Sequence, residues 1–207
     1  MAKGTGITSP VLFVLLTLTL FVGGCASDPQ QPINLSAREA SVADTPMVAA
    51  VRAGDLERVQ ALAADGASLN TVTEAGTPLT VAVTENQDRI AWYLLSEGAN
   101  PERAGSNGET ALMVAAENGS RRLVQLLLSA GAKVNATDAA GSTPVIRAAG
   151  NGHLSVVKVL LAAGANVNVS QDGRSLLMHI VDSGDMLTAE MLLAAGADVN
   201  YRSERGV

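Results

Sequence analysis

The residues able to do chemistry in this chain are few and far apart. The only cysteine, Cys25, follows the run Leu20-Phe-Val-Gly-Gly24, and the two histidines are His153 and His179. A thiol or an imidazole acts as a nucleophile, base or metal ligand only beside suitable partner residues. Neither histidine stands in a recognisable pattern of this kind. The sequence therefore predicts no catalytic residue, no metal site and no cofactor, and we expect no small-molecule substrate.

Two further classes of function are excluded by motif and charge. The segment Gly150-Asn-Gly-His-Leu-Ser155 is glycine-rich like a phosphate-binding loop, but position 155 is serine and no strand precedes it. That context is wrong for the fingerprint, so we expect a turn between helices. The net charge of −6 argues against nucleic acid, which requires clustered Lys and Arg. With one cysteine, no disulfide forms within the chain.

Residues 1–24 have the composition of a targeting segment. Lys3 gives a small positive region, and Val11 to Val22 is an unbroken, mostly apolar run of about a dozen residues. A membrane-spanning helix needs roughly 20 apolar residues. The sequence therefore predicts a leader that is removed from the mature protein.

The end of this leader, Val22-Gly-Gly-Cys25, resembles a bacterial lipobox. The resemblance implies that Cys25 becomes the first mature residue and carries lipid on its sulfur. By analogy with Gram-negative lipoproteins, Ala26 implies the outer membrane, with the folded part facing the periplasm. An ordinary cleaved signal with an incidental cysteine, and an uncleaved anchor helix, remain alternatives. Residues 25–43 contain Pro29 and Pro32 and have the polar composition of a tether.

Two series of residues recur with the same period along the rest of the chain. The first series opens apolar segments, and the second closes them; in both, the spacings are 32, 33, 33 and 32 residues. The series are Thr45, Thr77, Thr110, Thr143 and Ser175, and Gly66, Gly98, Gly131, Gly164 and Gly196. This periodicity predicts a repeat array over residues 44–207, with units at about 44–74, 75–106, 107–139, 140–171 and 172–207.

Each unit reads as two helices and a polar turn. Thr or Ser is a good N-cap, and three units have proline at the first helical position, where the missing N–H costs nothing. The first helix stops at a residue that tolerates the left-handed conformation: Gly54, Asn86, Gly119, Gly152 or Gly184. Asp55, Ser120 and Asp185 are able to cap the second helix. The fold class is therefore an all-α solenoid with short β-turn projections.

The segment Gly141-Ser-Thr-Pro-Val-Ile-Arg-Ala-Ala-Gly-Asn-Gly-His-Leu-Ser-Val-Val-Lys-Val-Leu-Leu-Ala-Ala-Gly-Ala-Asn-Val-Asn168 resembles the ankyrin repeat over its full length. The resemblance covers residues 44–207. It implies binding of another protein through the turn tips and the concave surface of the first helices. The corresponding positions are Arg52, Thr84, Glu85, Glu109, Glu117, Asn118, Ser142, Asn151, Arg174, Asp182 and Ser183.

The chain departs from the family pattern in three ways. The histidine of the family's Thr-Pro-Leu-His motif is replaced by Val48, Thr80, Met113, Ile146 and Met178. We therefore expect its polar network to be absent and the repeats to stack by aliphatic burial. The two 32-residue spacings predict shorter turns before Thr77 and Ser175. The small alanine of the first helix becomes Ile180 in unit five, which predicts looser or rearranged packing there.

Two other features bear on surfaces. Trp92 aligns with polar positions and should be exposed, whereas Tyr93 aligns with apolar positions and should be core. Unit five is rich in Met and Leu, although repeat arrays need polar terminal faces. We expect either a fragment of a longer array, which we favour, or a partner covering that face.

Together these observations predict a membrane-anchored periplasmic lipoprotein that binds another envelope protein as a scaffold or adaptor. The alternative is an immunity or inhibitor protein that neutralises a periplasmic toxin or hydrolase. An enzyme is disfavoured because the sequence shows no nucleophile, base or metal cluster.

Overall fold

The computed structural model of the protein describes residues 44–171 and 173–201. The chain divides into two units, residues 1–35 and residues 36–207, and all described residues belong to the second. The second unit has its own continuous hydrophobic core, so we expect residues 36–207 to fold by themselves. The expected leader, the tether and Cys25 lie outside the described residues.

The described residues form five helix pairs and one small hairpin. In each pair a seven-residue helix is followed by a nine-residue helix. The pairs are α2 (Pro46–Arg52) and α3 (Leu56–Ala64), α4 (Pro78–Thr84) and α5 (Asp88–Ser96), α6 (Ala111–Glu117) and α7 (Arg121–Ser129), α8 (Pro144–Gly150) and α9 (Leu154–Ala162), and α10 (Leu176–Asp182) and α11 (Met186–Ala194). Strands β1 (Ser170–Gln171) and β2 (Arg174–Ser175) form the hairpin.

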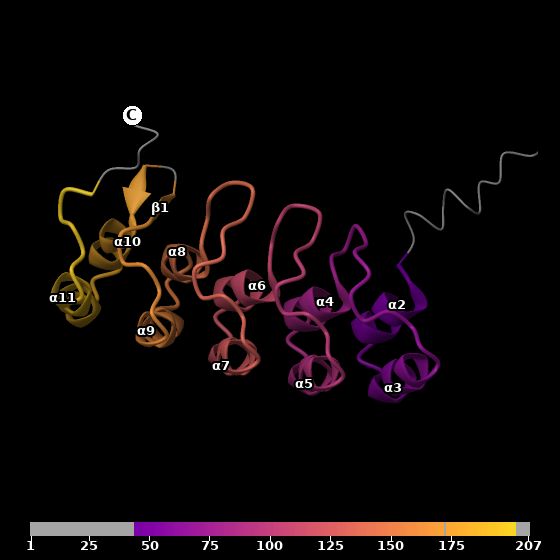
Figure 1. Cartoon of the computed structure of the whole chain (residues 1–207). Coiled ribbons are helices and arrows are strands. Elements are labelled where there is room, and N and C mark those ends of the chain that lie inside the picture. Colours follow the sequence, from indigo (N-terminus) through magenta and orange to yellow (C-terminus); the bar gives the residue numbers. More distant parts are fainter. Residues whose placement is uncertain (1–43, 172, 202–207) are drawn as a thin grey trace, which may run out of the picture. The chain divides into compact units, whose positions relative to one another are not determined.

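The helices lie in two rows, with the first helices in one row and the second helices in the other (Figure 1). The turns between repeats project beside the row of first helices. We call the first helices, their flanking residues and these turns the inner face, and the second helices the outer face. The predicted all-α repeat solenoid is confirmed. None of the described helices is long and apolar enough to cross a bilayer.

The predicted N-caps begin all five first helices. In four of them the hydroxyl accepts a backbone N–H three residues on, for example Thr45 from Val48 at 3.2 Å. Thr77 adds the reciprocal bond, because the Thr80 hydroxyl lies 2.6 Å from the Thr77 nitrogen. The exception is Thr143, whose Oγ1 is buried without a hydrogen-bond partner in the described residues.

The second helices are capped less regularly. Asp55 accepts from the Arg58 N–H at 2.9 Å and Asp185 from the Thr188 N–H at 3.0 Å, as predicted. The prediction for Ser120 is wrong, because its side chain makes no capping bond. Its backbone N–H instead donates to Ala115 across the preceding turn.

The turn lengths follow the repeat spacings. Two backbone-bonded turns span five residues, Gly105–Glu109 and Asp138–Ser142. The turns before Thr77 and within the β1–β2 hairpin span four, Thr73–Gly76 and Gln171–Arg174. The predicted shortening of these two turns is confirmed.

The core consists of small aliphatic side chains stacked from repeat to repeat. Ala82, Ala115 and Ala148 have no exposed surface, so neighbouring helices approach closely. Ile180 takes this position in the fifth repeat and is equally buried. Leucines of the second helices fill the space between the rows, and burying each contributes about 1.5–3 kcal/mol.

The repeats stack by aliphatic burial as expected, and a ladder of hydrogen bonds that was not expected also joins adjacent repeats. Each rung runs from a backbone N–H of one repeat to a side-chain oxygen of the repeat before it. The rungs are Asn100 to Asn70 at 2.7 Å, Lys133 to Glu102 at 2.8 Å, Asn166 to Asn135 at 2.8 Å and Asp198 to Asn168 at 2.9 Å. These bonds therefore give the repeats a periodic polar link in addition to the core.

Candidate protein-binding face

Most of the predicted partner-binding residues lie on the inner face with exposed side chains. These are Arg52, Thr84, Glu85, Glu117, Asn118, Asn151, Arg174, Asp182 and Ser183, whereas Glu109 is half-buried. Most of the partner-binding residues predicted from the ankyrin resemblance are therefore accessible to a partner.

Ser142 is a correction to that set, because it has no exposed surface. Its hydroxyl donates to Gln171 Oε1 at 2.8 Å, and its N–H donates to Asp138 Oδ1 at 2.8 Å. The β1–β2 hairpin therefore covers the side chain. Ser142 positions two neighbouring turns and does not offer its side chain to a partner.

Arg147 of α8 lies on the inner face, surrounded by three carboxylates from different segments. Its Nη1 lies 2.5 Å from Glu109 Oε1 and 2.5 Å from Glu117 Oε2, and its Nη2 lies 2.6 Å from Asp138 Oδ2. The Arg147 side chain is only 15% exposed. It therefore ties α8 to both ends of α6 and to the turn between these repeats.

Sequence reasoning missed Arg147 and Asp138, although one signal was present. The position of Arg147 within its repeat is held by Ala49, Val81 and Val114 in the first three units and by His179 in the fifth. A charge at a half-buried position that is apolar in three of the other four repeats requires a paired partner. That partner was already among the predicted residues, as Glu109 and Glu117.

Both members of the Arg147–Asp138 pair are held in the charged state. Burial alone would raise the pKa of Asp138, but hydrogen bonds from Arg147 and from the backbone of Ser142 outweigh it, so the pKa is lowered. For Arg147, burial alone would lower the pKa, but bonds to Asp138 and Glu109 raise it overall. Three carboxylates facing one guanidinium leave the cluster with excess negative charge.

A pocket of about 500 Å³ opens above this cluster. Its polar lining comes from α6, α8, α10 and the β1–β2 hairpin: Glu109, Glu117, Arg147, Asn151, Gln171, Arg174 and His179. At its edge Arg174 forms an ion pair with Asp182. The pocket therefore combines an acidic wall with several hydrogen-bonding groups.

His153 contributes to the frame of this pocket. Its Nε2 lies 2.8 Å from the backbone oxygen of Glu117, linking the start of α9 to the end of α6. Gly119 packs against the ring so closely that a Cβ there would meet His153 Nδ1 at 2.5 Å. This arrangement gives His153 a structural role at the junction of two repeats. No group of three or more His, Cys, Asp or Glu suited to a metal ion occurs in the described ranges.

The inner face as a whole is acidic. Among the described residues, the first helices with two residues on either side and the turns Thr73–Gly76, Gly105–Glu109, Asp138–Ser142 and Gln171–Arg174 carry seven carboxylates and three arginines, and each arginine is paired with at least one of those carboxylates. The carboxylates are Asp44, Glu74, Glu85, Glu109, Glu117, Asp138 and Asp182, and the arginines are Arg52, Arg147 and Arg174. Such a surface favours a cationic partner.

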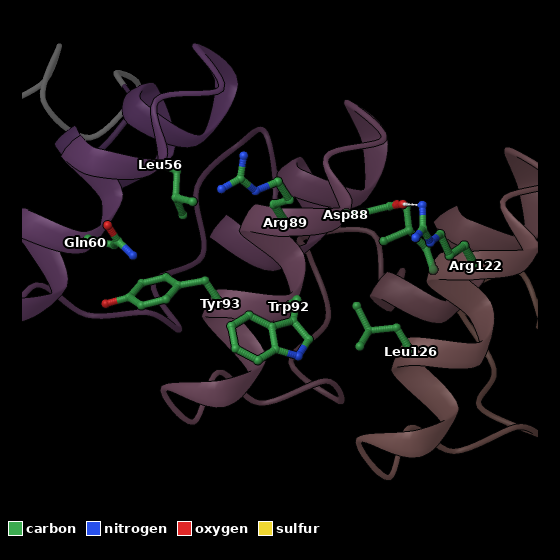
Figure 2. Close-up of a pocket in the computed structure, with 9 residues that line it drawn as sticks. Leu56, Gln60, Asp88, Arg89, Trp92, Tyr93, Arg122 and Leu126 are labelled. Atoms are coloured by element: carbon green, nitrogen blue, oxygen red, sulfur yellow. Dashed lines mark ion pairs between the residues drawn. The ribbon is translucent and has the colours of Figure 1, made fainter.

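The outer face has a different character. A groove of about 570 Å³ runs over α3, α5 and α7, and Figure 2 shows its residues. Trp92 is 60% exposed there, as predicted. Tyr93, which was expected in the core, is only half-buried: it packs against the core and lines the groove, extending toward Gln60 of α3. An ion pair of 3.3 Å joins Asp88 to Arg122 at the rim.

Comparison with known protein families agrees with this architecture. A family model described as ankyrin repeats, three copies, matches residues 18–105, 47–138 and 112–203. The chain belongs to the ankyrin repeat family. Membership supports binding to a protein partner, because these arrays typically act as protein-binding scaffolds. No curated protein matches the sequence.

Proposed function

We propose that this protein is an ankyrin-repeat lipoprotein of the bacterial envelope that binds another envelope protein through its inner face. Attachment is through lipid on Cys25, in the outer membrane, with the array in the periplasm. The lipobox-like Val22-Gly-Gly-Cys25 supports the anchor, and family membership supports the protein partner. The array then acts as a scaffold or adaptor.

The observation that carries the binding proposal is the acidic pocket around Arg147. Arg147 neutralises only part of the charge of Glu109, Glu117 and Asp138, and the Glu117 side chain is 48% exposed. A lysine or arginine of the partner entering this pocket would meet carboxylates that are already held in place. Positioned charges of this kind increase both specificity and association rate.

Site-specific photocrosslinking in the envelope tests the binding face. A crosslinkable residue at Asn151 reports on the inner face, and one at Gln125 on the exposed outer face provides the matched control. We expect one protein to be captured from Asn151 and not from Gln125. Capture of that protein only from Gln125 would overturn the choice of face.

The anchor is tested separately by Cys25→Ser. We expect this variant to move from the membrane fraction to a soluble or unprocessed form. If it stays in the outer membrane, attachment through Cys25 is wrong, whatever the crosslinking shows.

The acidic inner face also fits the alternative role of an immunity or inhibitor protein, since it would bind a cationic toxin or hydrolase. The two roles differ in what the captured protein does. An inhibitor abolishes its partner's enzymatic activity at equal concentrations and rescues cells that express it. A scaffold leaves that activity in place.

A further inference from the structure

The central part of the outer face concentrates positive charge in an otherwise acidic protein. Helices α5, α7 and α9 contain four basic residues and a single acidic one, Asp88. The basic residues are Arg89, Arg121, Arg122 and Lys158, of which Lys158 is paired with Asp185 at 3.4 Å. The neighbouring helices α3 and α11 carry Glu57 and Glu190. The chain as a whole has a net charge of −6, so positive charge is gathered on these three helices.

The positions of two of these arginines do not favour helix stability. Arg121 and Arg122 are the first two residues of α7, where the helix dipole favours negative charge and disfavours cations. The Arg122 side chain is 86% exposed and is only partly compensated by Asp88 at 3.3 Å. An exposed pair of this kind contributes little to stability. A binding partner outside the protein therefore explains these two arginines better than helix stability does.

Trp92 lies within the same charged surface. It is the only tryptophan in the chain, is 60% exposed, and borders a groove that Arg89 and Arg122 also line. A second groove, of about 520 Å³, is lined by Arg121 and Lys158 between α7 and α9. Tryptophan is enriched at the headgroup level of membranes, where long basic side chains reach anionic phosphates.

We propose that the outer face of α5, α7 and α9 docks on anionic phospholipid headgroups. Charge complementarity over three consecutive helices, with Trp92 among the cations, carries this choice of occupant. The proposal rests on the proposed anchor, because a tether holds the array near a bilayer and makes a weak surface contact effective. Docking in this orientation points the acidic inner face away from the membrane.

Vesicle binding by the unlipidated unit of residues 36–207 tests the surface without the anchor. The probes are vesicles of phosphatidylcholine alone and of phosphatidylcholine with phosphatidylglycerol. We expect co-sedimentation only with the anionic vesicles, a shift of Trp92 emission to shorter wavelength, and loss of both at high salt. Absence of binding to anionic vesicles at low salt overturns the proposal.

The double variant Arg121→Glu/Arg122→Glu identifies the face. We expect its affinity for the anionic vesicles to fall about tenfold or more, since each basic residue contributes to attraction by the surface. Arg103→Glu/Lys133→Glu makes the same change in net charge at exposed positions that line neither groove, and should bind more tightly than the first pair. Circular dichroism verifies that both variants are folded.

Two results would contradict the assignment of this face. One is equal loss of binding in the two double variants, and the other is binding without any change in Trp92 emission. A protein captured in the Trp92 groove, with no vesicle binding, would also show that the occupant is different. Each of these outcomes leaves the Cys25→Ser fractionation result intact, so failure of the docking surface is distinguishable from failure of the anchor.

Discussion

Arg147 of α8 and Asp138 in the preceding turn form an ion pair that is almost closed to solvent. Their Nη2 and Oδ2 atoms are 2.6 Å apart, with side-chain exposures of 15% and 4%. Asp138 Oδ1 also accepts N–H groups from Ala140 and Ser142. The pair thus fixes the shape of a projecting turn and the position of the Arg147 guanidinium on the binding face.

Replacing Arg147 with leucine should strongly destabilise the array. The substitution leaves Asp138 buried without its cation, and removing one member of a buried pair costs about 3–5 kcal/mol. Urea denaturation followed by circular dichroism measures the loss. Arg122→Leu removes an exposed ion pair and should change stability by less than about 1 kcal/mol. Similar losses in the two variants would show that the Arg147 cluster contributes no more than a surface pair.

Acid should weaken the contribution of Asp138. Its pKa in the folded protein is lowered from the ordinary value of 3.8, so the unfolded chain takes up the proton first as pH falls. The stabilisation is complete well above pH 3.8, and it declines as pH falls through 3.8 toward the folded-state pKa. The difference in unfolding free energy between wild type and Asp138→Asn should shrink over that interval. A difference independent of pH would contradict the assignment.

Two methionines at the same repeat position should respond differently to truncation. Met113 has no exposed surface because the next repeat covers it, whereas the Met178 side chain in the fifth repeat is 47% exposed. Met113→Ala should cost about 2–5 kcal/mol through lost burial and a cavity. Met178→Ala should cost much less. Thermal denaturation of the two variants compares them, and a larger loss for Met178 would mean that this face is covered in solution.

Two glycines have nearly the same backbone conformation but different surroundings. Comparing their alanine variants distinguishes the cost of backbone strain from the cost of a steric clash. Gly119 and Gly152 have φ of +70° and +73°, and only Gly119 is packed against a ring, that of His153. Gly152→Ala should cost about 1–2 kcal/mol from the left-handed conformation alone. Gly119→Ala should cost more, because it also displaces His153 from Glu117. Denaturant midpoints measure both, and equal costs would mean that the His153 contact is easily rearranged.

Local signals made most of the fold predictable from the sequence. A capping hydroxyl such as Thr45, or a left-handed stop such as Asn86, acts within one turn of chain, and the 32-residue spacings translated directly into shorter turns. Contacts between repeats were harder to predict. Ser142 aligned with a turn tip, but Gln171 from the next turn covers it, and this depends on how two projections pack together.

The cluster of charges around Arg147 was also hard to predict, because it is formed by contacts between repeats. The resemblance placed Glu109 and Glu117 on the binding face. It did not indicate that Arg147, which lies in the first helix of the next unit, would pair with both. The environment of Arg147 is assembled from segments up to 38 residues apart. The repeat period locates each residue within its own unit, and it does not specify which side chains meet across units.

The four turns along the binding edge differ in length. In chain order they are short, long, long and short: Thr73–Gly76, Gly105–Glu109, Asp138–Ser142 and Gln171–Arg174. The helix pairs therefore repeat more regularly than the projections beside them. A partner that contacts all four projections must fit two kinds of turn, so turn length adds to charge as a source of specificity.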